Sequence, residues 1–152
     1  MEVETLRSAQ GDILTKVFLM TELTIGLNAE ITLTVTEADT AAKWGSGLVP
    51  VFSTPALVGI MEAAAVKALD GHLPDHQTTV GGHIDVHHLA ATPVGMQVRA
   101  RAELTAIDGK KLTFHIEAWD ELEKIGEAHH ERFVVDKEKF VTRVQAKHKT
   151  EK

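Results

Sequence analysis

Glu62 is a carboxylate in the middle of a run that is otherwise almost wholly apolar. Within residues 56–69 only Glu62 and Lys67 carry a charge. Burying an unpaired carboxylate is costly, so Glu62 lies either on a solvent-exposed helix edge shared with Lys67 or in a pocket where it does chemistry. The pocket is the favoured interpretation, because such groups are typical of active sites. Glu62 is therefore a candidate nucleophile or general base.

His88 is the second residue that does not fit a packing role. Alternation along residues 79–89 predicts a strand with one apolar face, formed by Val80, Gly82, Ile84, Val86 and His88. A lone histidine on such a face is either a hydrogen-bonded core residue or a proton-transfer group, and the pattern alone favours the core residue. His83, Asp85 and His87 on the other face fit a solvated surface better than a metal site. His129 and His130 point to opposite faces and are weaker candidates. We expect neither a metal nor a cofactor.

Gly81 and Gly82 lie side by side early in the same predicted strand. Paired glycines there indicate a bulge or a close approach by a ligand, and close contact with a helix backbone is about as plausible. The sequence contains no G-x-G-x-x-G fingerprint, no phosphate-binding G-x-x-x-x-G-K loop and no G-x-S-x-G nucleophile elbow.

One long helix is expected to position Glu62. Thr54-Pro55 predicts its start, with Thr54 as N-cap and Pro55 at the first helical position, and Gly71 predicts its end. The run is apolar almost all round, yet it is shorter than the roughly 20 residues that span a bilayer. Other elements of the protein must therefore wrap it.

The wrapping elements are predicted strands at residues 30–35, 79–89, 97–107, 112–119 and 124–135, with Asp108-Gly109 as a hairpin turn. A short helix is expected at residues 37–43. This order predicts an α+β fold, in which a curved antiparallel sheet surrounds one buried helix. Residues 30–136 form this domain. Residues 1–29 stay unassigned, and the basic tail, residues 137–152, is expected to form a helix that docks through Phe140 and Val144.

Composition limits the partners. The chain has 152 residues, no cysteine and a formal net charge of −6. One domain is expected, disulfides and thiolate sites are excluded, and nucleic acid is a poor partner for so acidic a protein. No targeting or membrane-spanning segment is convincing, which favours a cytoplasmic protein without a membrane partner. Met20 is an alternative start.

The ordered set of these residues resembles the hotdog-fold acyl-CoA thioesterases, most closely their fluoroacetyl-CoA thioesterase branch. The resemblance rests on Thr54-Pro55, Glu62, Gly81, His88 with the A-A-T-P-x-G that follows it, and His130-Glu131-Arg132. It implies a hotdog fold and a catalytic triad of Thr54, Glu62 and His88. It also implies that the backbone N–H of Gly81 lies near the thioester carbonyl.

The resemblance implies a thioesterase that hydrolyses a short-chain acyl-CoA. The branch closes its acyl pocket with a phenylalanine-bearing lid, and residues 43–48 contain no phenylalanine, so selectivity for a fluorinated acyl group is not expected. A hotdog enoyl-CoA hydratase or dehydratase and a non-catalytic acyl-CoA-binding protein remain alternatives.

The acidic chain must supply local cations for the phosphates of CoA. Arg132 is the first candidate, and Lys110 or Lys111 are weaker ones. A surface salt bridge of Arg132 to Glu131 or Glu103 is at least as common an outcome for a single arginine.

The open edges of one curled sheet predict a homodimer or a higher homo-oligomer. Thr54 and Glu62 are eight residues apart on one helix, so a direct hydrogen bond between them within one chain is not expected. We therefore expect an active site that takes residues from both subunits.

Overall fold

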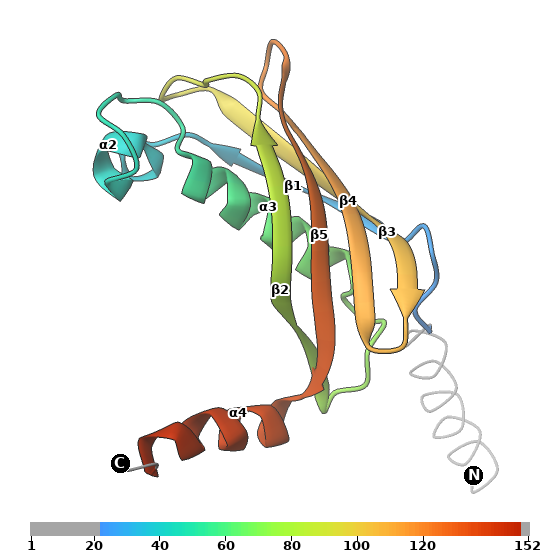
Figure 1. Cartoon of the computed structure of the whole chain (residues 1–152). Coiled ribbons are helices and arrows are strands. Elements are labelled where there is room, and N and C mark those ends of the chain that lie inside the picture. Colours follow the sequence, from blue (N-terminus) through green and yellow to red (C-terminus); the bar gives the residue numbers. More distant parts are fainter. Residues whose placement is uncertain (1–21, 150–152) are drawn as a thin grey trace, which may run out of the picture.

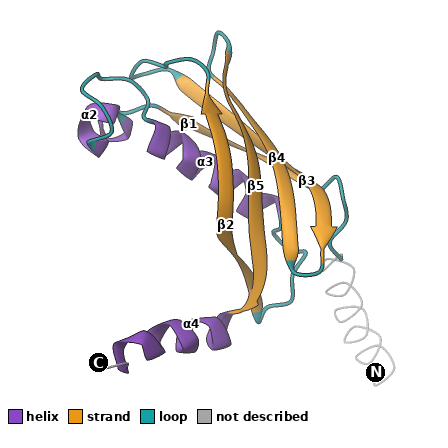
Figure 2. Cartoon of the chain, in the orientation of Figure 1, coloured by secondary structure: helices purple, strands orange, loops and turns teal. Residues whose placement is uncertain are grey.

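Five antiparallel strands form one sheet that curves around a single long helix, as Figures 1 and 2 show. The computed structural model describes residues 22–149. The strands are β1 (Asn28–Thr34), β2 (Gln77–His88), β3 (Gln97–Asp108), β4 (Lys111–Trp119) and β5 (Lys124–Asp136), and the helix is α3 (Thr54–Ala68). The spatial order is β1-β3-β4-β5-β2, so β1 and β2 are the sheet edges. The predicted α+β fold class is confirmed.

The smaller elements differ in detail from the predictions. The expected helix over residues 37–43 is a short turn, η1 (Glu37–Asp39), followed by α2 (Ala41–Trp44). β1 begins at Asn28, two residues before the predicted domain start. Expectations about residues 1–21, including a start at Met20, lie outside the described residues. None of the helices in residues 22–149 is both long and apolar enough to cross a membrane.

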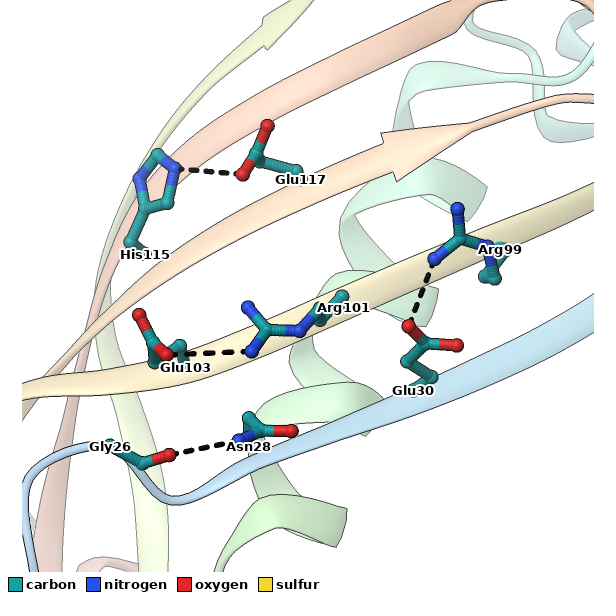
Figure 3. A network of polar contacts seen from close by, with 8 residues as sticks. All are labelled: Gly26, Asn28, Glu30, Arg99, Arg101, Glu103, His115 and Glu117. Carbon is teal, nitrogen blue, oxygen red and sulfur yellow. Dashed lines mark hydrogen bonds and ion pairs between the residues drawn. The ribbon is translucent and has the colours of Figure 1, made fainter.

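Strict alternation on the central strands separates the core from the outer surface. The inward side chains of β3 and β4 are buried: Val98, Ala100, Ala102, Leu104, Leu112, Phe114, Ile116 and Ala118. The outward ones include charged groups that pair with one another (Figure 3), such as Arg99 with Glu30 at 2.9 Å and Arg101 with Glu103 at 3.4 Å. Exposed pairs of this kind add little stability, so burial of the inner face holds the sheet to α3.

The sheet covers only one side of α3. Its buried residues are Leu57, Ile60, Met61, Ala64, Ala65 and Ala68. Gly59 and Ala63 are exposed, and Val66 is 50% exposed. The prediction of a helix wrapped all round is therefore wrong within one chain, because one apolar face of α3 stays open beside the edge strand β2.

The helix begins one residue earlier than predicted. Ser53 is the N-cap, and its Oγ accepts a hydrogen bond from the backbone N–H of Ala56 at 3.1 Å. Thr54 is the first helical residue, which places Pro55 second. The prediction of Thr54 as cap is wrong because serine and threonine are both good caps, and the Thr54 hydroxyl is bonded elsewhere.

A bulge in β2 changes which residues face the helix. The register with β5 shifts between Gly81 and His83. Gly81 pairs with Arg132 and Ile84 with His130, so Gly81 shares the helix-facing side with Ile84, Val86 and His88. A Cβ on Gly82 would collide with the ring of Phe133. The predicted bulge is thus confirmed, whereas the assignment of Gly82 and Val80 to the apolar face is wrong.

The basic tail forms the predicted helix but does not dock as predicted. α4 (Lys137–Gln145) follows β5 directly and continues into η2 (Ala146–Lys149). Figure 1 shows α4 leaving the end of β5 and pointing away from the sheet. Phe140 is half-buried, and Val144 is 42% exposed. In the single chain, α4 therefore makes little contact with the core.

The cap assignment predicts that Ser53→Ala lowers the free energy of unfolding by about 1 kcal/mol, because the backbone N–H of Ala56 loses its acceptor. Urea denaturation followed by circular dichroism measures the change. The control is Ser46→Ala, an exposed serine nearby, for which we expect a change within about 0.5 kcal/mol. Equal values for the two variants would contradict the assignment.

Candidate active site

The first half of the site joins the start of α3 to the end of β2. Thr54 Oγ1 and His88 Nδ1 share a hydrogen bond of 2.8 Å. The other ring nitrogen, His88 Nε2, is buried and has no hydrogen-bond partner among the described residues. Burial lowers the pKa of His88 from its usual value, and the backbone of Ala90 partly opposes this effect. We call these two residues the Thr54–His88 pair. The lowered pKa favours the neutral form of the His88 imidazole, and its Nε2 is left for proton transfer.

A hollow of about 360 Å³ opens beside the Thr54–His88 pair. Its wall includes Phe52 and Ser53 before α3, Ala41 and Ser46 at α2, and residues 88–91 after β2. Phe52 is almost fully buried and forms a rigid apolar part of the wall. A hollow of this size next to a hydroxyl and an imidazole has room for an acyl group.

The second half of the site lies on the next turns of α3 and the facing strands. Arg132 Nη1 donates a hydrogen bond to Glu62 Oε2 at 3.3 Å. A Cβ added to Gly81 would lie 2.9 Å from the same Glu62 oxygen and 3.3 Å from Arg132 Nη1. A side chain at position 81 would push the Glu62 carboxylate away, so the glycine lets the carboxylate approach the strand backbone. The Glu62 side chain is 41% exposed, so it lies at a partly open edge of the helix, as one interpretation expected, but Arg132 holds its carboxylate in place.

Arg132 is buried, with 6% of its surface exposed. Its Nε donates to Thr79 Oγ1 at 2.9 Å, and its Nη2 donates to the Thr79 carbonyl at 3.1 Å. Burial lowers the pKa of Arg132, which Glu62 opposes. The prediction of Arg132 as a ligand of the CoA phosphates does not fit this position, because strand alternation turns it toward the helix. The alternative surface pairs with Glu131 or Glu103 are not formed either.

His130 completes this half of the site. Its Nδ1 lies 2.7 Å from the backbone carbonyl of His83, so Nδ1 carries the proton and donates it. Nε2 is then an acceptor, and Arg132 Nη1 lies 3.2 Å from it. Burial lowers the pKa of His130, which favours this neutral form. One nitrogen of Arg132 is thus fixed between His130 and Glu62.

Sequence reasoning ranked His130 as a weak candidate and missed Thr79. A signal was present, because residues 126, 128, 130 and 132 share the helix-facing side of β5, and two of these four are polar. We call Glu62, Thr79, Gly81, His130 and Arg132 the Glu62 cluster.

The two halves are separate within one chain. Thr54 and Glu62 are eight residues apart on α3, which corresponds to about 12 Å. Gly81 and His88 are seven residues apart on β2, which corresponds to roughly 20 Å. The structure therefore places Thr54 with His88, and Glu62 with Gly81 and Arg132, as two half-sites.

The chemistry of these groups suits acyl transfer to water. A carboxylate can attack or activate water, a backbone N–H can stabilise an oxyanion, and a neutral imidazole can carry a proton. The described residues contain no group of three or more His, Asp or Glu side chains arranged to hold a metal ion.

Comparisons with known proteins agree with this chemistry. A family model described as fluoroacetyl-CoA-specific thioesterase matches residues 35–138. A fluoroacetyl-CoA thioesterase of Streptantibioticus cattleyicolor is 40% identical over 97 residues, which are 64% of this chain and 70% of the relative. The match extends over the Thr54–His88 pair and the Glu62 cluster, since both lie within residues 35–138.

Solved structures show the same fold. A variant of the fluoroacetyl-CoA-specific thioesterase FlK, in complex with fluoroacetate and CoA, has a TM-score of 0.74 at 32% identity, and the match covers 78% of this chain and 99% of that one. A hypothetical protein of Thermus thermophilus, described as a thioesterase superfamily member, has a TM-score of 0.78 at 28% identity, over 87% and 100% of the two chains. The chain therefore has the hotdog fold and belongs to the fluoroacetyl-CoA-specific thioesterase family of acyl-CoA thioester hydrolases.

Proposed function

We propose that the protein hydrolyses a short-chain acyl-CoA to the free acid and CoA, with Thr54, Glu62 and His88 as catalytic residues. The observation that carries the proposal is the position of the Glu62 carboxylate, which Arg132 holds against the backbone of Gly81. Cytoplasmic location is part of the same proposal.

In this mechanism Glu62 either attacks the thioester carbonyl directly or removes a proton from the attacking water. The new C–O bond forms as negative charge develops on the carbonyl oxygen, which the Gly81 N–H stabilises. When Glu62 acts as base, the proton it takes from water passes to His88, which delivers it to the departing sulfur as the C–S bond breaks, so the acid and CoA are released. When Glu62 attacks directly, C–S cleavage leaves a mixed anhydride with Glu62. His88 then removes a proton from the water that hydrolyses this anhydride and passes it to the CoA thiolate, which restores the Glu62 carboxylate. Thr54 orients the imidazole through their 2.8 Å hydrogen bond. Arg132 acts as a positioning residue for Glu62.

The segment at residues 43–48 supports a general short-chain acyl-CoA as substrate over fluoroacetyl-CoA in particular. The hollow beside the Thr54–His88 pair measures about 360 Å³. The segment at residues 43–48, where the family carries a phenylalanine, offers Trp44 and Leu48, which are 55% and 98% exposed. Neither Trp44 nor Leu48 lines the hollow, and no phenylalanine of this segment closes over it, so selection for fluorine is not part of the proposal.

We also infer that the working enzyme is at least a homodimer. β2 is a 12-residue edge strand with a row of unpaired backbone groups. The open apolar face of α3, which includes Val66, also lacks a cover within the chain. A two-fold axis near the middle of β2 would place the His88 end of each strand beside the Gly81 end of its partner. The two half-sites would then meet across the interface.

Removing either proposed acid–base group is expected to lower kcat by roughly 10²-fold or more. The variants are Glu62→Gln and His88→Ala, and the measurement is release of free CoA thiol from a panel of short-chain acyl-CoAs. His87→Ala is the control, because His87 lies on the opposite, exposed face of the same strand. Turnover like that of wild type in either variant would remove that residue from the mechanism.

The same panel separates the proposed reaction from its alternatives. A hydratase or dehydratase would change the absorbance of an enoyl-CoA without releasing thiol. A non-catalytic protein would bind acyl-CoA and change neither signal.

A shared site predicts that two inactive variants restore activity when their subunits are mixed. In a heterodimer of Glu62→Gln with His88→Ala, one site carries both lesions and the other carries none. Random exchange, by joint unfolding and refolding, should therefore recover about a quarter of wild-type activity. Absence of recovery would place Glu62 and His88 of one chain in one site.

The control for subunit mixing is Thr54→Ala with His88→Ala. These two residues are hydrogen-bonded within one chain, so every Thr54–His88 pair in the heterodimer carries a lesion. No activity above the mean of the two parent variants is expected.

The buried imidazole also predicts a pH dependence. Burial lowers the pKa of His88 below its usual 6.5. Because the mechanism needs the neutral imidazole, we expect kcat/KM to fall on the acid side only below pH 6.5. Unfolded His88 takes up its proton before the folded residue does. Its stabilising contribution is therefore complete above pH 6.5 and is lost as the pH falls below that value. NMR titration of the His88 ring, assigned with His88→Gln, measures the pKa; a value at or above 6.5 would contradict the prediction.

A further inference from the structure

Several cationic side chains in the described part of the chain are paired with acids, and others, such as Lys43 in α2, form no ion pair. The pairs on the sheet include Arg99 with Glu30, Arg101 with Glu103, Lys111 with Glu131, and Lys124 with Glu117. Around α4, Lys110, Lys139 and Arg143 form no ion pair with any residue in 22–149. In a protein with a net charge of −6, three unpaired cations in one place are a local exception.

These three cations line one pocket of about 390 Å³. Lys110 comes from the turn between β3 and β4, whereas Lys139 and Arg143 come from α4. The remaining wall includes Val134, Val135 and Phe140, and the Arg143 guanidinium lies 5.5 Å from the centre of the Phe140 ring. The pocket thus combines positive charge with an aromatic ring and an apolar wall.

The one acidic residue in the pocket wall is already engaged. Asp136 is the N-cap of α4, and its Oδ1 accepts a hydrogen bond from the backbone N–H of Lys139 at 3.0 Å. This bond lowers the pKa of Asp136. Asp136 therefore stays ionised and offsets part of the positive charge, but its side chain forms no ion pair with Lys110, Lys139 or Arg143 within 4.0 Å in the described residues, so their ammonium and guanidinium groups keep their donors for an anion from outside.

The distance from the pocket to the proposed catalytic groups is comparable to the length of the pantetheine arm of CoA. β5 connects Arg132, which holds Glu62, to Asp136 in the pocket wall, and four strand residues span about 13 Å. An acyl-CoA has its thioester at one end of a long uncharged pantetheine arm and its phosphates and adenine at the other. The separation along β5 is of the scale that this arm bridges.

We propose that the pocket formed by Lys110, Lys139, Phe140 and Arg143 binds the phosphate-bearing nucleotide end of acyl-CoA. The proposal rests on the proposed function, and it gives the phosphate-binding role to residues other than the buried Arg132. Arginine and lysine form charge-assisted hydrogen bonds with phosphate oxygens. The ring of Phe140 and the guanidinium plane of Arg143 offer surfaces on which an adenine can stack.

The test compares two substrates that share one acyl group. The first is the acyl-CoA, and the second is the N-acetylcysteamine thioester, which lacks the nucleotide. In the double variant Lys139→Gln/Arg143→Gln, KM for acyl-CoA should rise roughly tenfold or more with kcat nearly unchanged. kcat/KM for the truncated thioester should stay as in wild type.

A matched control carries the same change in charge outside the pocket. Lys147→Gln/Lys149→Gln removes two unpaired cations of η2 that do not line it. An unchanged KM in the pocket variant, an equal rise in the control, or an equal loss on the truncated thioester would each overturn the proposal.

Failure of the proposed function gives a different result. A wild-type protein that releases no thiol from either thioester is not a thioesterase for that acyl group. Calorimetric binding of CoA itself still tests the pocket in that case: weaker binding in the pocket variant alone supports the proposal, and equal binding in all three proteins overturns it.

Discussion

The buried guanidinium of Arg132 is the constraint on which the site depends. A cation removed from water needs nearly every donor satisfied, because an uncompensated buried charge costs several kcal/mol. The partners come from three elements: Glu62 on α3, Thr79 on β2 and His130 on β5. Satisfying Arg132 therefore fixes the helix against the two strands at the sheet edge, and it fixes the Glu62 carboxylate as one of the required acceptors.

The bulge in β2 makes this arrangement possible. The register shift between Gly81 and His83 turns Gly81 toward the helix, where a Cβ would meet the Glu62 carboxylate. The backbone carbonyl of His83, which lies in the same bulge, accepts a hydrogen bond from His130 Nδ1–H. This bond leaves His130 Nε2 as an acceptor for Arg132. A local backbone defect thus sets both the close approach of the carboxylate and the tautomer of the neighbouring imidazole.

The sequence predicted the elements well because their periodicity is local. The alternation on β3 and β4 and the Asp108-Gly109 turn each depend on neighbouring residues. It could not choose Ser53 over Thr54 as the cap of α3, because both residue types cap helices and the choice depends on His88, 34 residues away. It could not predict which face of β2 carries Gly81, because counting by twos fails at a bulge. Arg132 was misassigned because its partner Glu62 is 70 residues away.

Net charge alone is a weak guide to which anions a protein binds. The cations on the outer face of the sheet form ion pairs with neighbouring carboxylates. Each pair is nearly neutral, so it adds little to the electrostatic potential at a distance. Lys110, Lys139 and Arg143, which line the pocket beside α4, form no ion pair in the described residues although the whole chain is acidic. The reacting end and the anionic end of the substrate would therefore meet different environments, one built around the mutually paired charges of Glu62 and Arg132 and one with unpaired cations. Substitutions at the anionic end would act mainly on binding, because its contacts are the same in the ground state and the transition state. Those at Arg132 would act on the chemical step, because its contacts set the position of Glu62.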